Sequence, residues 1–112
     1  MLEISRHTIA AYNDVRLNDV FNKYKWYGTE VTGKILDLVG FGRIGRRLRE
    51  LAEPFQMNVF CYDPYVTAEA AAGYGMRKME LDDMIAQADF ITIHLPLTPE
   101  TKKCSRQTVS RK

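Results

Sequence analysis

The sequence predicts an α/β fold, in which a partial doubly wound parallel sheet of about four strands, in the order 3-2-1-4, follows an N-terminal helix. Two observations predict it. After Gly33, short apolar runs alternate with helical patterns in the order β-α-β-α-β-α-β, and strands that alternate with helices form parallel sheets. A glycine-rich turn joins the first of these strands to the helix that follows, as it does in doubly wound folds.

The length and composition suit one small domain. The chain has 112 residues, of which 46% are hydrophobic and 27% charged, close to the average of soluble globular proteins. The net charge of +2 is too balanced to favour nucleic acid or a membrane surface as a partner. No apolar run approaches the roughly 20 residues of a membrane span. Cys61 and Cys104 lack a CxxC spacing and predict free thiols in a reducing compartment, hence a cytoplasmic location.

Residues 1–32 are predicted to form an N-terminal region of one helix and a loop. Apolar residues recur at a period of about 3.6 over residues 1–16, as they do in a helix: Leu2, Ile9, Tyr12 and Val15. Residues 18–27 are polar and aromatic, and they predict a loop in which Trp26 is exposed or docked. This region therefore precedes the sheet and lies outside it.

Residues 33–101 are predicted to contain the sheet, and residues 102–112 form a polar, basic tail. Four strands are expected, at residues 35–39 and 58–62, weakly within 73–79, and at 90–95. The helix after the glycine turn has an apolar stripe of Ile44, Leu48, Leu51, Ala52 and Phe55. Further helices are expected at residues 67–72 and 81–88, the former with Thr67 as its N-cap.

The glycine turn has the sequence GFGRIG, which fits the dinucleotide-binding pattern G-x-G-x-x-G. Gly40 permits the tight turn out of the strand, and Gly42 has no Cβ to keep a pyrophosphate from the backbone. Gly45 lets the helix pack closely on the sheet. The N–H groups of Arg43 and Ile44 then point at the phosphates from the helix N-terminus.

An acidic residue follows the second strand at the spacing that this pattern requires. Asp63 lies 18 residues after Gly45, where an acid can accept hydrogen bonds from the ribose hydroxyls of NAD. Its charge would repel the 2′-phosphate of NADP. The turn and the acid together predict binding of NAD in preference to NADP. The alternative is a tight strand–helix turn that binds no ligand.

Three sequence elements together resemble one family. GFGRIG, YDP and HLPLTPET are similar to the D-isomer-specific 2-hydroxyacid dehydrogenases, which include phosphoglycerate, glycerate, D-lactate and formate dehydrogenases. The resemblance runs from the first helix to about Thr101. It implies a Rossmann-type NAD-binding domain of an oxidoreductase, without indicating which 2-hydroxy acid is the substrate.

The resemblance also assigns roles to individual residues. It gives Arg43 and Ile44 the pyrophosphate contact and Asp63 the adenosine ribose. The stretch that lines the adenine side of the cofactor in this family matches Leu95, Pro96 and Leu97. With the three glycines of the turn, these residues make up the predicted cofactor site.

No catalytic or metal-binding residue is predicted. In the resembled family, the substrate lobe precedes this region, and the catalytic arginine, glutamate and histidine follow it. His94 matches a histidine that is not catalytic in the family, and His7 matches nothing catalytic. The 112 residues are therefore expected to be inactive alone, as a truncated or decayed relative or as a fragment of a longer reading frame.

Three residues depart from the family pattern. Asp37 is a carboxylate in the middle of a strand that a parallel sheet covers on both faces, and Arg49 replaces a small residue. Gln56 stands where a glycine is usual, and it costs on the order of 1 kcal/mol if this position needs a positive φ. These departures suggest a truncated or decaying relative, or a fragment of a longer reading frame.

A non-catalytic interaction module is the competing interpretation. In the resembled family, the first helix and the loop around Trp26 belong to the dimerisation region. The last strand would also leave an unpaired hydrophobic edge, which is a site for strand pairing. Either feature would let the chain form a homo-oligomer or associate with a longer homologue.

Overall fold

The computed structural model describes residues 1–19, 22, 24–96, 98, 99 and 102. The chain divides into two compact units after Thr32. No helix in the described ranges combines the length and the apolar character that crossing a membrane requires. The tail from residue 103 onward, including Cys104, lies outside the described residues.

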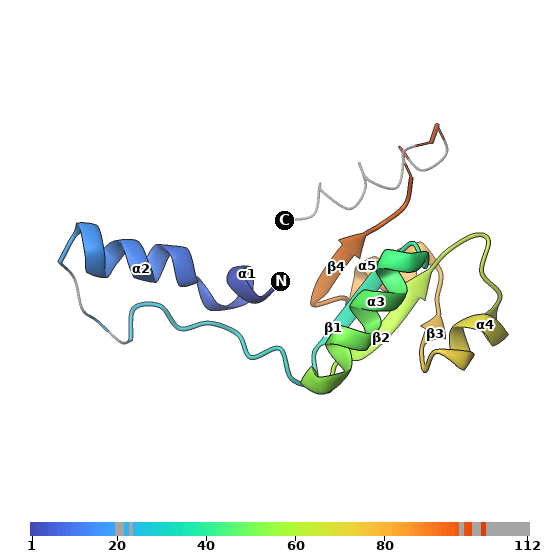
Figure 1. The fold of residues 1–112 in the computed structure, drawn as a ribbon, viewed down its shortest axis with the longest axis horizontal. Helices are drawn as coiled ribbons and strands as arrows, with labels where there is room; N and C mark the ends of the chain where they lie inside the picture. Colours follow the sequence, from blue (N-terminus) through green and yellow to red (C-terminus); the bar gives the residue numbers. More distant parts are fainter. Residues whose placement is uncertain (20–21, 23, 97, 100–101, 103–112) are drawn as a thin grey trace. The chain divides into compact units, whose positions relative to one another are not determined.

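The second unit is built on a parallel sheet of four strands in the order β3-β2-β1-β4, as predicted (Figure 1). The strands are β1 at Ile35–Val39, β2 at Asn58–Tyr62, β3 at Arg77–Lys78 and β4 at Phe90–Ile93. β4 ends two residues before the predicted Leu95, because its partner strand β1 ends at Val39, which pairs with Ile93. The central strand β1 pairs with both β2 and β4.

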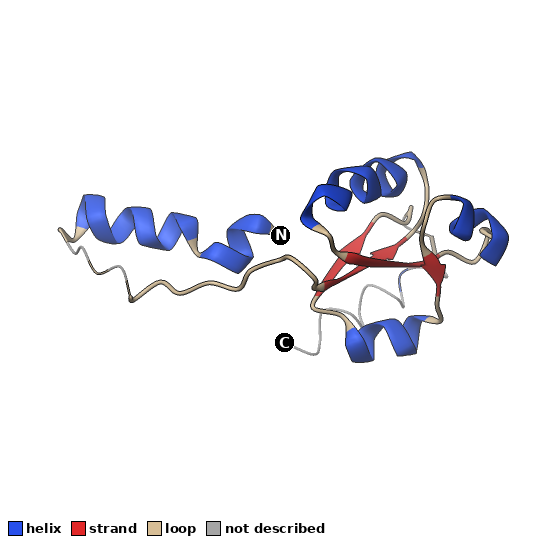
Figure 2. Ribbon diagram, turned by 90° about the horizontal axis from the view of Figure 1, so that it is seen from below, coloured by secondary structure: helices blue, strands red, loops and turns tan. Residues whose placement is uncertain are grey.

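Helices cover both faces of this sheet. α3 at Arg43–Ala52 lies on one face and α5 at Leu81–Gln87 on the other (Figure 2). α4 at Ala68–Gly73 connects β2 to β3, and the predicted cap is confirmed because the Thr67 hydroxyl accepts the N–H of Ala70 at 3.2 Å. The most deeply buried apolar side chains belong to β1, β2 and α5: Leu36, Leu38, Val39, Cys61 and Met84.

Asp37 is completely buried in the middle of β1, as the sequence predicts. Neither of its carboxylate oxygens has a hydrogen-bond partner in the described part of the chain. Asp37 is paired in register with Phe60 of β2 and Ile91 of β4, which offer it no polar side chain. A carboxylate in this position destabilises the sheet when it is ionised, because burial removes its hydration without replacing it.

The first unit contains two helices where one was predicted. α1 spans Leu2–Arg6 and α2 spans Thr8–Leu17, and between them His7 adopts a left-handed conformation with φ 54°. The Glu3 side chain explains the break, because its carboxylate oxygens accept the backbone N–H groups of Thr8 at 3.2 Å and Ile9 at 3.1 Å. Glu3 thus caps α2 from outside that helix.

Trp26 docks onto α2. Its indole Nε1 donates to a carboxylate oxygen of Asp14 at 2.8 Å, and Lys25 Nζ lies 2.5 Å from the same oxygen. The hydrogen bonds from Lys25, Asn18 and Trp26 lower the pKa of Asp14. The loop of the first unit is therefore attached to α2 through one buried acid, Asp14.

Gln56 adopts the left-handed conformation that the sequence comparison anticipated. It follows the 3₁₀ turn Glu53–Phe55, and its φ of 54° and ψ of 36° suit glycine better than a residue with a Cβ. We expect Gln56→Gly to raise the free energy of unfolding by about 1 kcal/mol in urea titrations. Gln56→Ala is the matched control, because alanine keeps the Cβ and should bring no gain. Equal stabilities of the two variants would contradict the explanation.

Candidate nucleotide-binding site

Gly40 begins a turn that crosses closely over the end of β4. Its φ is 102°, and a Cβ at this position would lie 2.8 Å from the carbonyl carbon of His94. The Gly40 N–H donates to the carbonyl oxygen of Tyr62 at 2.8 Å, which ties the turn to the end of β2. Only glycine combines this φ with this approach of two backbones.

Gly45 and Gly42 serve different purposes. A Cβ on Gly45 would lie 2.7 Å from the carbonyl oxygen of Gly40, so this glycine lets α3 pack against the turn itself. A Cβ on Gly42 would meet no described atom within 4 Å. The space above Gly42 is open, as a site for a pyrophosphate requires.

The N-terminus of α3 is available to an anion. The helix begins at Arg43, and its N-cap Gly42 has no side chain to cap it. The first N–H groups of a helix lack partners within the helix and carry a partial positive charge. Arg43 and Ile44 supply two of these N–H groups beside the open space at Gly42.

Asp63 is held firmly at the end of β2. Only 8% of the residue is exposed, and its two carboxylate oxygens accept the N–H groups of Phe41 at 2.9 Å and Tyr65 at 2.8 Å. Each oxygen has a second lone pair, so the carboxylate can still accept hydroxyl hydrogens. The sequence predicts the acid but not this attachment to the glycine turn.

The third part of the predicted site follows β4. The His94 N–H donates to the carbonyl oxygen of Val39 at 2.7 Å, and its ring Nε2 lies 2.8 Å from the Thr92 hydroxyl. The N–H nitrogen of Leu95 would lie 3.0 Å from a Cβ on Gly40, so Leu95 borders the turn. Pro96 comes next and is exposed, whereas Leu97 lies outside the described residues.

The fold thus brings most of the predicted residues to one edge of the sheet. The glycine turn, Asp63 and Leu95 follow three neighbouring parallel strands, and ligands bind at the carboxyl ends of such strands. Their roles toward a cofactor stay predictions.

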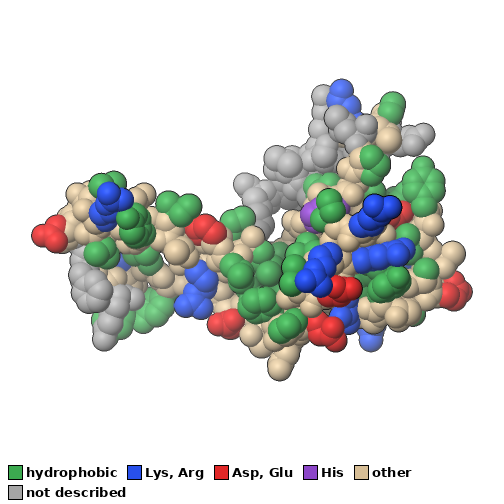
Figure 3. All heavy atoms as spheres, viewed as in Figure 1, with side chains coloured by type: hydrophobic (Ala, Val, Ile, Leu, Met, Phe, Trp, Pro, Cys, Tyr) green, Lys and Arg blue, Asp and Glu red, His purple; other side chains and the backbone are tan. Residues whose placement is uncertain are grey.

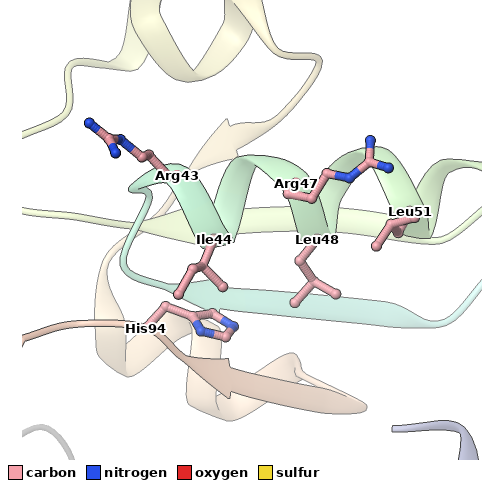
Figure 4. A pocket seen from close by; sticks show the side chains of 6 residues that line it. All are labelled: Arg43, Ile44, Arg47, Leu48, Leu51 and His94. Atoms are coloured by element: carbon pink, nitrogen blue, oxygen red, sulfur yellow. The ribbon is translucent and has the colours of Figure 1, made fainter.

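A cavity that the sequence did not predict lies between α3 and the end of β4. Its volume is about 350 Å³, and it is lined by Arg43, Ile44, Arg47, Leu48, Leu51 and His94 (Figure 4). Ile44, Leu48 and His94 point into it, whereas the Arg43 guanidinium points away. Ile44 is 66% exposed and Leu51 53% exposed. The apolar stripe of α3 was therefore visible in the sequence, but its exposure was not.

The arginines of α3 have separate surroundings. Arg and Lys side chains gather over this helix beside hydrophobic ones (Figure 3). Arg47 pairs with Glu50 and Arg49 with Glu53, each at 2.7 Å. Arg49 is largely covered, and one of its terminal nitrogens would lie 2.7 Å from a Cβ on Gly75. Of the four arginines, Arg43 alone directly follows Gly42 in the chain.

Comparisons with known proteins agree with this geometry. Residues 1–109 match the family described as D-isomer specific 2-hydroxyacid dehydrogenase, NAD binding domain. D-3-phosphoglycerate dehydrogenase of Mycobacterium tuberculosis is 42% identical over 101 residues, which cover 90% of this chain and 19% of that protein. The enzyme of the same name from Bacillus subtilis is 35% identical over 109 residues, covering 96% of this chain and 21% of that protein.

Solved structures show the same relationship. The apo-structure of D-lactate dehydrogenase from Escherichia coli superposes with a TM-score of 0.78 and 30% identity, covering 90% of this chain and 32% of that one. Salmonella D-lactate dehydrogenase gives a TM-score of 0.80 and 31% identity, covering 90% and 30%. This chain spans about a fifth of the length of the curated relatives that it matches.

Proposed function

This chain belongs to the NAD-binding domain family of the D-isomer specific 2-hydroxyacid dehydrogenases, and on that premise we propose that its residues bind the ADP half of NAD for an oxidoreductase that acts on a 2-hydroxy acid. The observation that carries the proposal is the open space above Gly42 at the uncapped start of α3. A pyrophosphate fits there, because it needs both close approach to backbone and unpaired N–H groups. The bound nicotinamide would supply hydride transfer.

Each predicted residue has a task in this proposal. The N–H groups of Arg43 and Ile44 bind the pyrophosphate, and Asp63 accepts the adenosine ribose hydroxyls through the lone pairs that its backbone partners leave free. Leu95 and Pro96 line the adenine side, and the resemblance extends this role to Leu97, which lies outside the described residues. Because Asp63 is fixed by two N–H groups, it would not need to reorganise when the ribose binds.

We expect NADH to bind at least about tenfold more tightly than NADPH, although weakly, because only one half of the cofactor is contacted. Isothermal titration of the 112-residue chain with each cofactor measures both constants. Asp63→Asn keeps the size of the side chain and one acceptor oxygen but removes the negative charge, so it should bring the two affinities closer together. NADPH binding as tight as NADH to the unaltered chain would refute the role of Asp63.

Catalysis is assigned to residues outside this stretch. Reduction of a 2-oxo acid needs a proton donor at the carbonyl and a cation for the carboxylate. In the described residues, the ring of His94 contacts Thr92, and His7 lies between α1 and α2 in the other unit. We expect these 112 residues alone to oxidise no NADH above the blank with pyruvate, glyoxylate, hydroxypyruvate or 2-oxoglutarate.

A second candidate function is self-association, favoured by apolar side chains that the first unit leaves exposed. Six of them lie on α1 and α2 and are between 48% and 73% exposed: Leu2, Ile4, Ile9, Tyr12, Val15 and Leu17. In this proposal a second copy of the chain would cover these side chains, as partners cover exposed apolar surface elsewhere. Sedimentation equilibrium would give a dimer mass if a second copy covers it, and a monomer mass at high concentration would argue against this function.

A cytoplasmic location accompanies the proposal. Cys61, the cysteine within the described residues, lies buried as a free thiol. Burial, and secondly the charge of Asp63, raise the pKa of this thiol and keep it protonated and unreactive. Such a cysteine is compatible with a reducing compartment.

A further inference from the structure

The side chain of Arg46 in α3 contacts two aromatic rings, whereas Arg47 and Arg49 of the same helix contact acidic side chains. Its guanidinium carbon lies 5.3 Å from the ring centre of Phe41 and 4.9 Å from that of Tyr74. The two rings meet edge to face, with their centres 5.3 Å apart and an angle of 77° between them. Arg47 and Arg49 form ion pairs on the same helix, but Arg46 has no ion pair with any acid of the described residues.

Phe41 connects this cluster to the candidate site. It stands between Gly40 and Gly42 in the turn, and only 2% of the residue is exposed. Its ring belongs to the cluster, while its N–H donates to a carboxylate oxygen of Asp63 at 2.9 Å. One residue therefore anchors the turn through its side chain and orients the acid through its backbone.

Tyr74 contributes from a distant part of the sequence. It is the C-cap of α4, where its N–H donates to Ala71, and the next residue, Gly75, lies against the side chain of Arg49. The end of α4 is thus held to α3 at two adjacent points. Movement of Phe41 would break contacts with both helices.

We infer that Arg46 and Tyr74 are positioning residues for the dinucleotide. Their side chains hold Phe41 in place, and Phe41 in turn holds the glycine turn and Asp63 in their binding geometry; we call this arrangement the clamp. This inference rests on the proposed function. It assigns the Arg46 charge to the two rings, through cation–π attraction, and not to the phosphates of the cofactor. Tyr74 acts through its ring, so its hydroxyl is dispensable.

NADH titration of single and double variants distinguishes the two roles of Arg46. Arg46→Gln and Tyr74→Leu should each weaken binding between about twofold and thirtyfold, the range that loss of one or two cation–π contacts corresponds to. Tyr74→Phe keeps the ring and should bind as the unaltered chain does. Arg47→Gln is the matched control, because it removes the same charge one residue further along α3.

The double variant Arg46→Gln/Tyr74→Leu should lose less affinity than the two single losses combined, because Arg46 and Tyr74 contact each other and both contact the ring of Phe41. Additive losses would mean that Arg46 contacts the phosphates directly, and would overturn the inference. Urea unfolding of every variant separates loss of binding from loss of the fold.

Amide hydrogen exchange of the chain without NADH gives a second, independent readout. Relative to the amide of Leu38 in β1, the Phe41 amide should exchange about tenfold faster in Arg46→Gln and Tyr74→Leu, and at the unaltered rate in Tyr74→Phe and Arg47→Gln. Unchanged exchange in all four variants refutes the clamp. Faster exchange in a chain that never binds NADH would refute the proposed function and leave the clamp of the turn standing.

Discussion

Replacing Asp37 by valine should raise the free energy of unfolding at pH 7 by about 4 kcal/mol. Burial, and secondly the charge of Asp89, raise the pKa of Asp37 from 3.8 to about 7. At pH 7 the carboxyl of Asp37 ionises in the unfolded chain, whereas the folded chain resists its ionisation. This difference in pKa lowers the free energy of unfolding by about 4 kcal/mol. Valine has a similar volume and suits the centre of a parallel sheet.

Asp37→Gly should also stabilise the fold, although by less. Glycine removes the same charge, but it loses roughly 0.5–1 kcal/mol of backbone entropy and leaves a space in the core. Guanidinium or urea unfolding of the three proteins at one pH ranks them. A lower midpoint for both variants, with an unchanged slope, would show that Asp37 is hydrated or paired.

The pH dependence of this effect has a definite sign. The pKa of Asp37 is higher in the folded state than its ordinary 3.8. Below about pH 4 the carboxyl is neutral in both states, so the stability of the fold with neutral Asp37 is fully present there. That stability falls as the pH rises and is lost once the pH passes the folded pKa of about 7. The advantage of the valine variant should therefore grow between these values and then stay constant.

The difference between the two pH profiles isolates Asp37. Subtracting one profile from the other removes the contribution of groups that titrate in both proteins. One of these groups is Asp14, whose lowered pKa gives stability the opposite dependence on pH. An advantage of the valine variant that does not change with pH would contradict the assignment to a buried ionisable group.

Gly40→Ala should destabilise the protein and abolish binding of NADH. Alanine at φ 102° is strained, and its Cβ would lie 2.8 and 2.9 Å from the carbonyl carbon and oxygen of His94, which are backbone atoms that cannot turn aside. We expect a loss of about 3 kcal/mol in the free energy of unfolding, since both the strain and the displaced turn contribute. Denaturant unfolding and NADH titration measure the two effects. Stability close to that of the unaltered chain would contradict the geometry of the turn.

The sequence predicts the strands and the glycine turn well because both leave local signals. β1 and β2 are short apolar runs with no helical period, and the spacing of Gly40, Gly42 and Asp63 follows from the shape of a dinucleotide. Asp37 stands out for the same reason, as a charge inside a buried run.

Contacts made by individual side chains leave no such signal. The break at His7 depends on Glu3 capping the start of the next helix, which competes with a continuous helical period. Arg46 and Tyr74 meet because α3 and α4 pack together, and nothing in either segment predicts the partner. The stripe through Ile44 shows that one face of α3 is apolar, but periodicity does not tell what covers it.

Titration of NADH into the unaltered chain, Gly42→Ala and Gly73→Ala tests the central claim most directly. A Cβ on Gly42 or on Gly73 meets no described atom within 4 Å, and neither needs a positive φ, so both variants should keep the fold to within about 1 kcal/mol. Only Gly42 borders the proposed pyrophosphate site. We expect saturable binding by the unaltered chain and Gly73→Ala, and none by Gly42→Ala. Equal binding by all three proteins, or binding by none, would contradict the account.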